Sequence, residues 1–276
     1  MAQATKSAGA QAVDRALEVL ELFDEPESRL TITEIAAAVG VHRSTASRLV
    51  AALERHRLLE HDGRRYALGL GLVSLAGHVL NRFPARARAA DLIRDLRDTT
   101  GETVYLGVPD QDEIIYIDQA PSPHLAHSAD WVGRRQRLTA GLTGAVILAF
   151  APDETTTELL RAGQSEGDPA AQHLKPEDLA HIRQTGYLAR YDDPTGNWAV
   201  VAAPIHNSRG DIVAALCLDA PHHRVDQHHF NQTLVPAATR TAAHISERLG
   251  YTRHGAQNQQ NRRSPLRTGD GSCEDR

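Results

Sequence analysis

Apolar residues recur every three or four positions in three consecutive segments near the amino terminus, as they do along one face of an α-helix. Thr31 and Glu34 at the start of the second segment form the Thr-x-x-Glu pattern of a capping box. Gly40, between the second and third segments, predicts a tight turn. The pattern therefore predicts three helices, over 12–23, 31–39 and about 42–55.

Two short apolar segments after the third helix are spaced like the strands of a hairpin. Asp62-Gly63 stands between them, a dipeptide that favours the tight turns of β-hairpins. Pro84 then interrupts a long helical pattern, because proline removes a helix hydrogen bond. We expect strands over 58–61 and 65–68, and helices over 70–81 and 86–100. Helix, helix, tight turn, helix and hairpin is the order of elements in a winged helix-turn-helix.

The period of the pattern changes after Glu102, where apolar runs and alternations typical of strands appear. Strands are expected over 103–108, 114–117, 198–205 and 211–218, with turns at 109–112 and 207–210. Helices are expected over 138–150, 155–162, 176–185 and 230–249, the last capped by Asp226. This half of the chain is therefore predicted to form an α/β domain.

Length and composition predict two folded domains with polar ends. The chain has 276 residues, and domains commonly have about 100–200. Small and polar residues dominate both ends, a composition typical of disorder. The expected organisation is a disordered lead (1–10), a winged helix-turn-helix domain (11–70), a linker helix (71–84), an α/β domain (85–250) and a disordered tail (251–276).

The net charge of −5 argues against a protein that coats nucleic acid without regard to sequence. Within 40–66, however, six arginines stand against three acidic residues, so this segment carries +3 and the remainder of the chain −8. The segment contains the third helix and the hairpin. Positive charge is therefore placed on the two elements with which a winged helix-turn-helix would contact DNA.

The third predicted helix has one apolar face and one polar face. Positions 46, 49, 50 and 53 share the apolar face, which leaves Ser47 and Arg48 on the face that would meet a major groove. Arginine bonds guanine edges in a bidentate way, and serine and threonine hold phosphates. The candidate DNA contacts are Arg43, Ser44, Thr45, Ser47 and Arg48 on the helix, and Arg64 and Arg65 on the hairpin. A protein-binding module with a solvated arginine face is the alternative interpretation.

Both halves of the chain resemble the IclR family of bacterial transcriptional regulators. The first half does so through AVDRALEVLELF and LTITEIAAAVGVHRSTASRLVAALERHRLLEHDGRRYALG. The second half does so through TGETVYLGVPDQDEIIYID, SPHLAHSADWVGRRQRLTAGLTGAVILAF and AAPIHNSRGDIVAALCLDAP, so the resemblance covers about 12–249. It implies a GAF-like α/β effector domain joined to the winged helix by a helical linker. It also implies dimers or tetramers and a small-molecule ligand, commonly a carboxylic acid or an aromatic catabolite.

The resemblance further implies a ligand-binding site where the first apolar helix of the second half begins. Free N–H groups at a helix start bind carboxylates, and the resemblance assigns those of Leu142 and Thr143 to the ligand. It adds Val200, Cys217 and Asp219 from facing strands, and Arg190 and Asp192 from a loop. An arginine favours an acidic ligand, whereas Asp219 favours a hydroxyl, an amine or a protonated group. Thr139 and Ala145 stand where the family usually has His and Lys, so the identity of the ligand stays open.

The residues give little support to other chemistry. Cys217 is most simply a small buried apolar side chain, and two cysteines make neither a disulfide framework nor a cysteine-rich zinc site. The chain has no serine-hydrolase, zinc-protease or phosphate-loop motif, so we expect no enzyme activity. No metal or other cofactor is expected, because no standard zinc spacing fits the four clustered histidines, His222, His223, His228 and His229.

No apolar run reaches the roughly 20 residues of a membrane-spanning helix, and the amino terminus lacks a signal peptide, so we expect a cytoplasmic protein. The resulting hypothesis is a ligand-responsive, sequence-specific DNA-binding regulator. Its expected partners are double-stranded operator DNA, a small-molecule effector and further copies of itself. The resemblance implies a repressor of a catabolic or metabolic operon. The alternatives are an activator, or a metabolite-sensing protein-interaction module that does not bind DNA.

Overall fold

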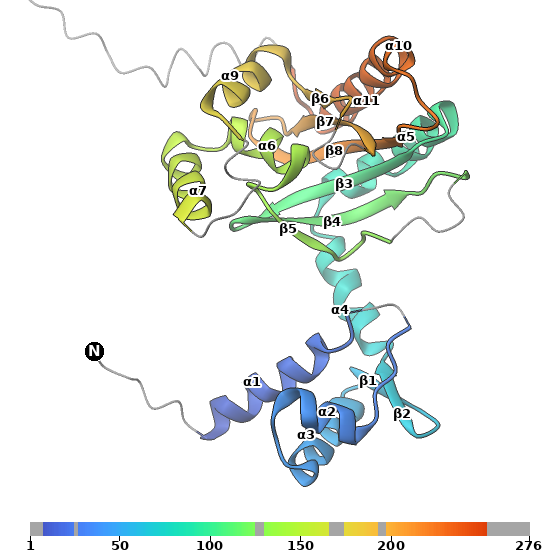
Figure 1. Ribbon diagram of the computed structural model, residues 1–276, viewed down its shortest axis with the longest axis vertical. Helices are drawn as coiled ribbons and strands as arrows, with labels where there is room; N and C mark the ends of the chain where they lie inside the picture. The colour runs from blue at the N-terminus through green and yellow to red at the C-terminus, as the bar shows by residue number, and fades with distance from the viewer. Residues whose placement is uncertain (1–7, 25–26, 125–129, 166–173, 193–196, 253–276) are drawn as a thin grey trace, which may run out of the picture. The chain divides into compact units, whose positions relative to one another are not determined.

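The computed structural model describes residues 8–24, 27–124, 130–165, 174–192 and 197–252. These residues belong to two compact units, Met1–Arg82 and Phe83–Arg276, each with its own hydrophobic core (Figure 1). The predicted lead and tail fall mostly outside the described residues, as does Cys273. None of the described helices is long and apolar enough to cross a membrane.

The amino-terminal unit consists of helices and one hairpin, as the hydrophobic pattern predicts. Its elements are α1 (Ala8–Glu21), α2 (Ile32–Val39), α3 (Arg43–Arg55), β1 (Leu59–Asp62), β2 (Arg65–Leu68) and α4 (Gly71–Leu80). Every helix and strand expected here is present. The largest difference is at the start of α1, which takes up Ala8 to Ala10 from the predicted lead.

Two local signals determine where α2 begins and where it ends. Thr31 Oγ1 accepts the N–H of Glu34 (3.3 Å) and Glu34 Oε2 accepts the N–H of Thr31 (2.7 Å), so the capping box is confirmed. Gly40 ends α2 with a φ of 70°, a left-handed conformation that glycine adopts without steric cost. The helices and the hairpin then close one core, with side chains such as Val19, Ile35, Val50, Leu53 and Leu59.

The carboxyl-terminal unit is built around a six-stranded antiparallel sheet. The strands are β3 (Thr103–Asp110), β4 (Glu113–Ala120), β5 (Arg135–Arg137), β6 (Leu188–Arg190), β7 (Trp198–His206) and β8 (Ile212–Pro221), in the spatial order β5-β4-β3-β8-β7-β6. The hydrophobic pattern predicts the four long strands. It misses β5 and β6, because three residues are too few to display an alternation.

Helices cover both faces of this sheet (Figure 1). The helices are α5 (Pro84–Thr100), α6 (Gly141–Phe150), α7 (Asp153–Ser165), α9 (Pro176–Thr185), α10 (Gln227–His229) and α11 (Val235–Arg248). α5 and α11 pack on each other and on one face of the sheet, while α6 packs on the other face and against α9. The predicted fold, a winged helix-turn-helix domain and an α/β domain, is confirmed.

Two helical segments begin differently from the prediction. The predicted break before Pro84 is present, since α4 ends at Leu80, but Pro84 itself opens α5, because the first turn of a helix needs no N–H donor. The last helical segment starts at α10 and passes through a π-helical turn, η1 (Phe230–Leu234), before α11. Asp226 accepts the N–H of His229 (2.7 Å), so its predicted capping role is confirmed.

Two boundaries in the α/β unit are also wrong in the prediction. β3 continues through Pro109 to Asp110, so its turn to β4 is confined to Gln111 and Asp112 rather than spanning 109–112. The helix expected from 138 begins only at Gly141. The N–H of Leu138 is bonded to the carbonyl of Asp112 (2.9 Å), which keeps the chain extended up to that point.

Candidate functional site

One face of α3 carries the polar side chains that are expected to meet DNA. Ala46, Val50 and Leu53 are buried on the opposite face. Exposed residues are Arg43, Ser44, Thr45, Ser47 and Arg48. Within the described part of the chain, the guanidinium groups of Arg43 and Arg48 make no hydrogen bond or ion pair. Both positive charges therefore stay available to a phosphate or a base edge.

The turn before α3 holds a residue that the sequence pattern does not mark. His42 is the N-cap of α3: its Nδ1 accepts the N–H of Ser44 (3.3 Å) and lies 2.8 Å from Ser44 Oγ. The cap satisfies one of the N–H groups that a helix start leaves open. Histidine stands outside the usual set of N-cap residues, so rules that search for Ser, Thr, Asp or Asn overlook it.

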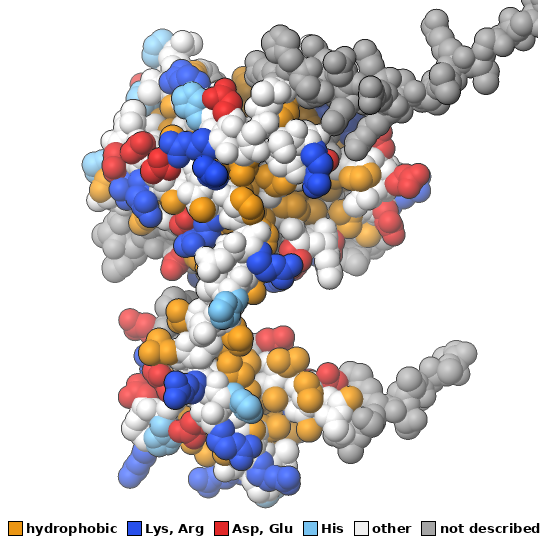
Figure 2. Space-filling view, turned by 180° about the vertical axis from the view of Figure 1, so that it is seen from behind, with side chains coloured by type: hydrophobic (Ala, Val, Ile, Leu, Met, Phe, Trp, Pro, Cys, Tyr) orange, Lys and Arg blue, Asp and Glu red, His pale blue; other side chains and the backbone are white. Residues whose placement is uncertain are grey.

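The hairpin of β1 and β2 presents one free arginine and one engaged arginine. Arg64, beside Gly63 at the tip, is exposed and has no hydrogen-bond or ion-pair partner among the described residues. Arg65 donates to the carbonyl of Arg29 (2.6 Å) and lies 3.4 Å from Glu34 Oε2. Arg65 thus holds the hairpin against the segment before α2, and Arg64 keeps its charge for a partner. Arginine side chains gather at this end of the unit (Figure 2).

The start of α6 brings a second set of predicted residues together. Leu142 and Thr143 are buried in its first turn, and the N-cap residue, Ala140, makes no side-chain cap. A helix start without a side-chain cap leaves amide N–H groups and the positive end of the helix dipole for a ligand. Tyr116 Oη lies 3.5 Å from Thr143 Oγ1 and donates to Gln136 Oε1 (3.2 Å).

β8 contributes Cys217 and Asp219 to the same place. The Cys217 thiol donates to Asp219 Oδ1 (3.2 Å), and the Thr143 hydroxyl is within hydrogen-bond reach of the same sulfur. Burial, and after it the charge of Asp219, raises the pKa of the Cys217 thiol, so the thiol stays neutral and unreactive. Val200 on β7 pairs with Asp219 across the sheet. Five of the predicted ligand residues therefore lie together; these are Leu142, Thr143, Val200, Cys217 and Asp219. We call this group, with the rings that line it, the α6 cluster.

Three aromatic rings line the α6 cluster. Tyr105, Tyr116 and Trp131 meet edge to face, with ring centroids 5.3, 5.8 and 6.1 Å apart. Burial raises the pKa of both phenols, and the nearby Asp219 adds to both shifts, so both stay protonated. The hydrophobic pattern does not reveal these rings, because strand alternation shows only that Tyr105 and Tyr116 are buried, and Trp131 lies in a loop before β5. Aromatic residues make up only 4% of the chain, so each one could have been considered as a candidate site residue.

The other two predicted ligand residues have partners elsewhere. Arg190 Nη2 lies 3.6 Å from Asp178 Oδ1 on α9. Asp192 is exposed, with its Oδ1 3.6 Å from His222 Nε2. The structure therefore ties neither side chain to the α6 cluster.

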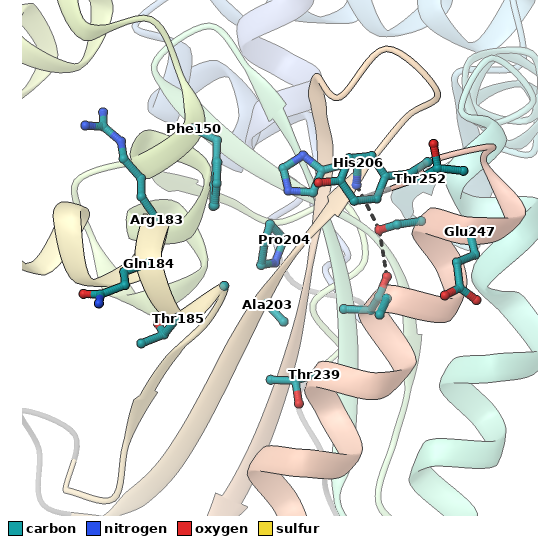
Figure 3. Close-up of a pocket in the computed structure, with 15 residues that line it drawn as sticks. Phe150, Arg183, Gln184, Thr185, Ala203, Pro204, His206, Thr239, Glu247 and Thr252 are labelled. Carbon is teal, nitrogen blue, oxygen red and sulfur yellow. Dashed lines mark hydrogen bonds between the residues drawn. The ribbon is translucent and has the colours of Figure 1, made fainter. Parts of the chain in front are cut away.

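A cavity of about 960 Å³ lies between α9, α11 and the edge of β7 (Figure 3). His206 forms part of its wall: its backbone N–H donates to Ser246 Oγ (3.0 Å), and Ser246 Oγ donates to the carbonyl of Ala242 (2.8 Å). Burial lowers the pKa of His206, so its ring is neutral. Arg183 on the opposite side is bonded to Asp153 Oδ1 (2.7 Å), and Glu247 is exposed. None of the predicted site residues lines this cavity.

The clustered histidines do not assemble into a metal site. Among the described residues, no three His, Cys, Asp or Glu side chains are placed to hold a metal ion. The ring of His222 instead stacks on Tyr191, with centroids 4.5 Å apart.

Two family models match the chain, "IclR helix-turn-helix domain" over residues 12–63 and "Bacterial transcriptional regulator IclR C-terminal" over residues 77–247. The chain belongs to the IclR family. Its amino-terminal unit is the helix-turn-helix domain of an IclR-family regulator, and its carboxyl-terminal unit is the effector-binding domain.

Individual IclR-family proteins match over almost the whole chain. The HTH-type transcriptional regulator XynR of Escherichia coli is 29% identical over 250 residues, which is 87% of this chain and 98% of that protein. The transcriptional repressor IclR of the same organism is 28% identical over 82% of this chain and 85% of its own length. The crystal structure of Thermotoga maritima IclR superimposes with a TM-score of 0.72 at 25% identity, covering 87% of this chain and 99% of that one. These relatives are transcriptional regulators, so this IclR-family chain is a regulator and not an enzyme.

Proposed function

We propose that this IclR-family protein represses a catabolic or metabolic operon. In this proposal α3 and the β1–β2 hairpin bind operator DNA, and a small carboxylic acid or aromatic molecule binds at the α6 cluster. Repression is supported by the similarity to the E. coli repressor IclR. A ligand changes DNA binding when its affinity differs between two arrangements of the protein. Because operator DNA is the target, we expect the protein to act in the bacterial cytoplasm.

The observation that carries the DNA-binding proposal is the exposed face of α3. It presents Arg43 and Arg48 without internal partners, next to the hydroxyls of Ser44 and Ser47. A solvated surface helix usually mixes both charge signs, but this face has no acidic residue between Arg43 and Ala51. Cations and hydroxyls without acids suit a phosphate backbone and base edges.

We also propose that the protein works as a homodimer or homotetramer. Helix-turn-helix proteins commonly bind two half-sites with two copies. Apolar side chains on α1 and α4 are exposed, among them Val13, Leu17, Val73, Leu75 and Val79. Exposed apolar patches mark interaction surfaces, and these two helices are the surface that we assign to a second copy.

The test of the DNA-binding proposal is an operator-binding measurement with Arg48→Ala. The operator is first located with the wild type on DNA upstream of its own gene, in a gel shift at several salt concentrations. If Arg48 bonds a base, Arg48→Ala costs about 1–3 kcal/mol and relaxes preference at one base pair. If Arg48 holds a phosphate, binding weakens equally for all sequences and the salt dependence falls.

Arg240→Ala is the matched control, because Arg240 is exposed on α11 in the effector-binding unit. It should leave operator affinity unchanged. An Arg48→Ala protein that binds the operator like wild type shows that α3 is not the recognition helix. A wild type that binds no upstream DNA, but still binds small molecules, favours a sensor module without a DNA target.

A further inference from the structure

The cavity between α9, α11 and the edge of β7 shares no residue with the α6 cluster (Figure 3). Its walls belong to the carboxyl-terminal unit alone. At about 960 Å³ it is as large as the small-molecule sites of other proteins, which span about 300–1,000 Å³. The structure therefore offers a second cavity to a small molecule, and the groups on its walls indicate which kind of molecule would fit.

His206, at the end of β7, presents a hydrogen-bond acceptor. Its ring is neutral, because burial lowers its pKa. Its Nδ1 lies 3.3 Å from the carbonyl oxygen of Gly210. A carbonyl only accepts, so Nδ1 carries the proton of the neutral ring, and Nε2 keeps a free lone pair.

This Nε2 atom opens into the cavity. His206 is 9% exposed, and within the described part of the chain no donor reaches Nε2. Among the same residues, Glu102 Oε2 is the only side-chain nitrogen or oxygen that is both unpartnered and shut off from solvent. Nε2 of His206 therefore meets open space, and the open space beside its ring is the cavity. An enclosed acceptor of this kind is left for a donor from water or from a ligand.

Neighbouring rings hold the imidazole of His206 in place. Phe150 meets it edge to face, with ring centroids 4.9 Å apart, and Tyr251 stacks on it with centroids 5.0 Å apart. Together with the bond to Gly210, these contacts fix the direction of Nε2. A binding group that is already oriented loses little conformational entropy when a ligand arrives.

Three hydroxyl groups on the cavity walls present acceptors as well. They belong to Thr185 on α9 and to Thr239 and Ser246 on α11. Each donates its proton to the carbonyl four residues earlier in its own helix, at 2.8–2.9 Å. A hydroxyl has one proton and two lone pairs, so these oxygens meet a ligand as acceptors. A molecule with several O–H donors would match them.

The two charged side chains that line the cavity have opposite signs. Arg183 is bonded to Asp153 Oδ1 (2.7 Å) and to the carbonyl of Ala149. The carboxylate of Glu247 is exposed and has no hydrogen-bond or ion-pair partner among the described residues. An anionic ligand would compete with Asp153 for Arg183 and would be repelled by Glu247. A cationic ligand would gain only at the exposed Glu247, where water weakens the attraction.

We propose that this cavity binds a neutral polyhydroxylated molecule of the sugar class. One hydroxyl of the ligand donates to His206 Nε2, and others donate to the oxygens of Thr185 and Thr239. The site is separate from the α6 cluster, so the inference goes beyond the proposed function and does not depend on it.

Sugars that differ only in charge test this inference. D-Glucose, D-galactose and D-mannose are neutral, whereas near neutral pH their 2-amino derivatives are cationic and their uronic acids are anionic. Binding to the full-length protein is followed by saturation-transfer NMR, which detects weak ligands. We expect at least one neutral sugar to bind with a Kd below about 10 mM, and about tenfold or more tightly than its two charged counterparts.

Three variants locate the binding. His206→Phe keeps a ring and removes the Nε2 acceptor, so it should weaken the sugar about three- to tenfold. Ala243→Trp fills the cavity from an exposed position of α11 and should abolish binding, which keeps the test valid if His206→Phe does not fold. Ala180→Trp is the control, because it makes the same change at an exposed position of α9 that does not line the cavity.

Three results overturn the inference: no binding by any neutral sugar at up to about 10 mM, a charged counterpart that binds as tightly as its neutral sugar, or binding that survives in Ala243→Trp. Operator binding is measured on the same samples by fluorescence anisotropy. A protein that binds its operator but fails the sugar test loses only the second site. A protein that binds a sugar but no operator loses only the proposed function.

Discussion

Among single residues, Glu102, directly before β3, has a buried carboxyl group. It is 2% exposed, and its Oε1 accepts both Nε and Nη2 of Arg224 at 3.2 Å. Among the described residues its Oε2 has no hydrogen-bond partner. Burial raises the pKa of this carboxyl, and the Arg224 charge limits the rise. Removing one partner of such a pair is costly, because the remaining charge is left uncompensated.

Arg224→Gln is expected to lower the free energy of unfolding by about 3 kcal/mol at about pH 8, measured with urea. The pKa of the folded Glu102 carboxyl then lies still further above its unfolded value, so the folded state binds the proton more tightly. An ionised carboxyl with a raised pKa destabilises the folded state. The loss of unfolding free energy caused by Arg224→Gln should therefore become smaller as the pH falls to about 5 and the carboxyl takes up a proton. Glu102→Gln/Arg224→Gln removes both charges and should lose this pH dependence. An equal cost of Arg224→Gln at both pH values would contradict the prediction.

Among the elements, α6 depends on a glycine for its position. A Cβ on Gly144 would lie 2.2 Å from the carbonyl oxygen of Leu138, whereas a Cβ on Gly77 in α4 meets nothing within 4 Å. Backbone atoms cannot swing aside, so Gly144→Ala should destabilise the protein by about 1–3 kcal/mol in urea unfolding. Gly77→Ala makes the same change without a clash and should be neutral or stabilise by up to about 1 kcal/mol, because alanine favours helix. Similar changes in the free energy of unfolding for Gly144→Ala and Gly77→Ala would show that α6 can move enough to accommodate the Cβ.

At the scale of the whole molecule, the exposed apolar residues on α1 and α4 form the surface that we propose for contact with a second copy. Leu17 is 53% exposed, and Val73 and Leu75 are 66% and 57% exposed. Orange side chains reach the surface of the amino-terminal unit in Figure 2. A second copy offers the same surface in return, as in a two-fold symmetric dimer. Packing two such surfaces removes apolar area from water.

Leu17→Glu/Val73→Glu is therefore expected to disrupt the proposed self-association, so that light scattering gives a smaller mass than for the wild type. Operator affinity should fall at least about tenfold, because a monomer contacts one half-site. Ala180→Glu places the same charge on an exposed position of α9 and should change neither mass nor affinity. A double variant with unchanged mass would assign self-association to another surface.

The sequence by itself determined the elements of the amino-terminal unit and the long strands of the sheet. The signals there are local: the Thr31 capping box, the Gly40 turn and the Asp62-Gly63 hairpin each act over a few residues. The face of α3 that offers Arg48 followed from the helical period in the same way. Whether these residues contact DNA stays a prediction.

Only the tertiary structure decided which rings and charge partners surround the predicted residues. Tyr105, Tyr116 and Cys217 come from distant parts of the chain, and the pairing of β3 with β4 and β8 brings them together. The fold also pairs Arg65 with Glu34 and Arg190 with Asp178, and hydrophobic periodicity does not predict such ion pairs. Helix and turn signals depend on neighbours in sequence, whereas charge partners depend on neighbours in space. The contact of Cys217 with Asp219 and the ion pair of Arg190 with Asp178 belong to the second kind.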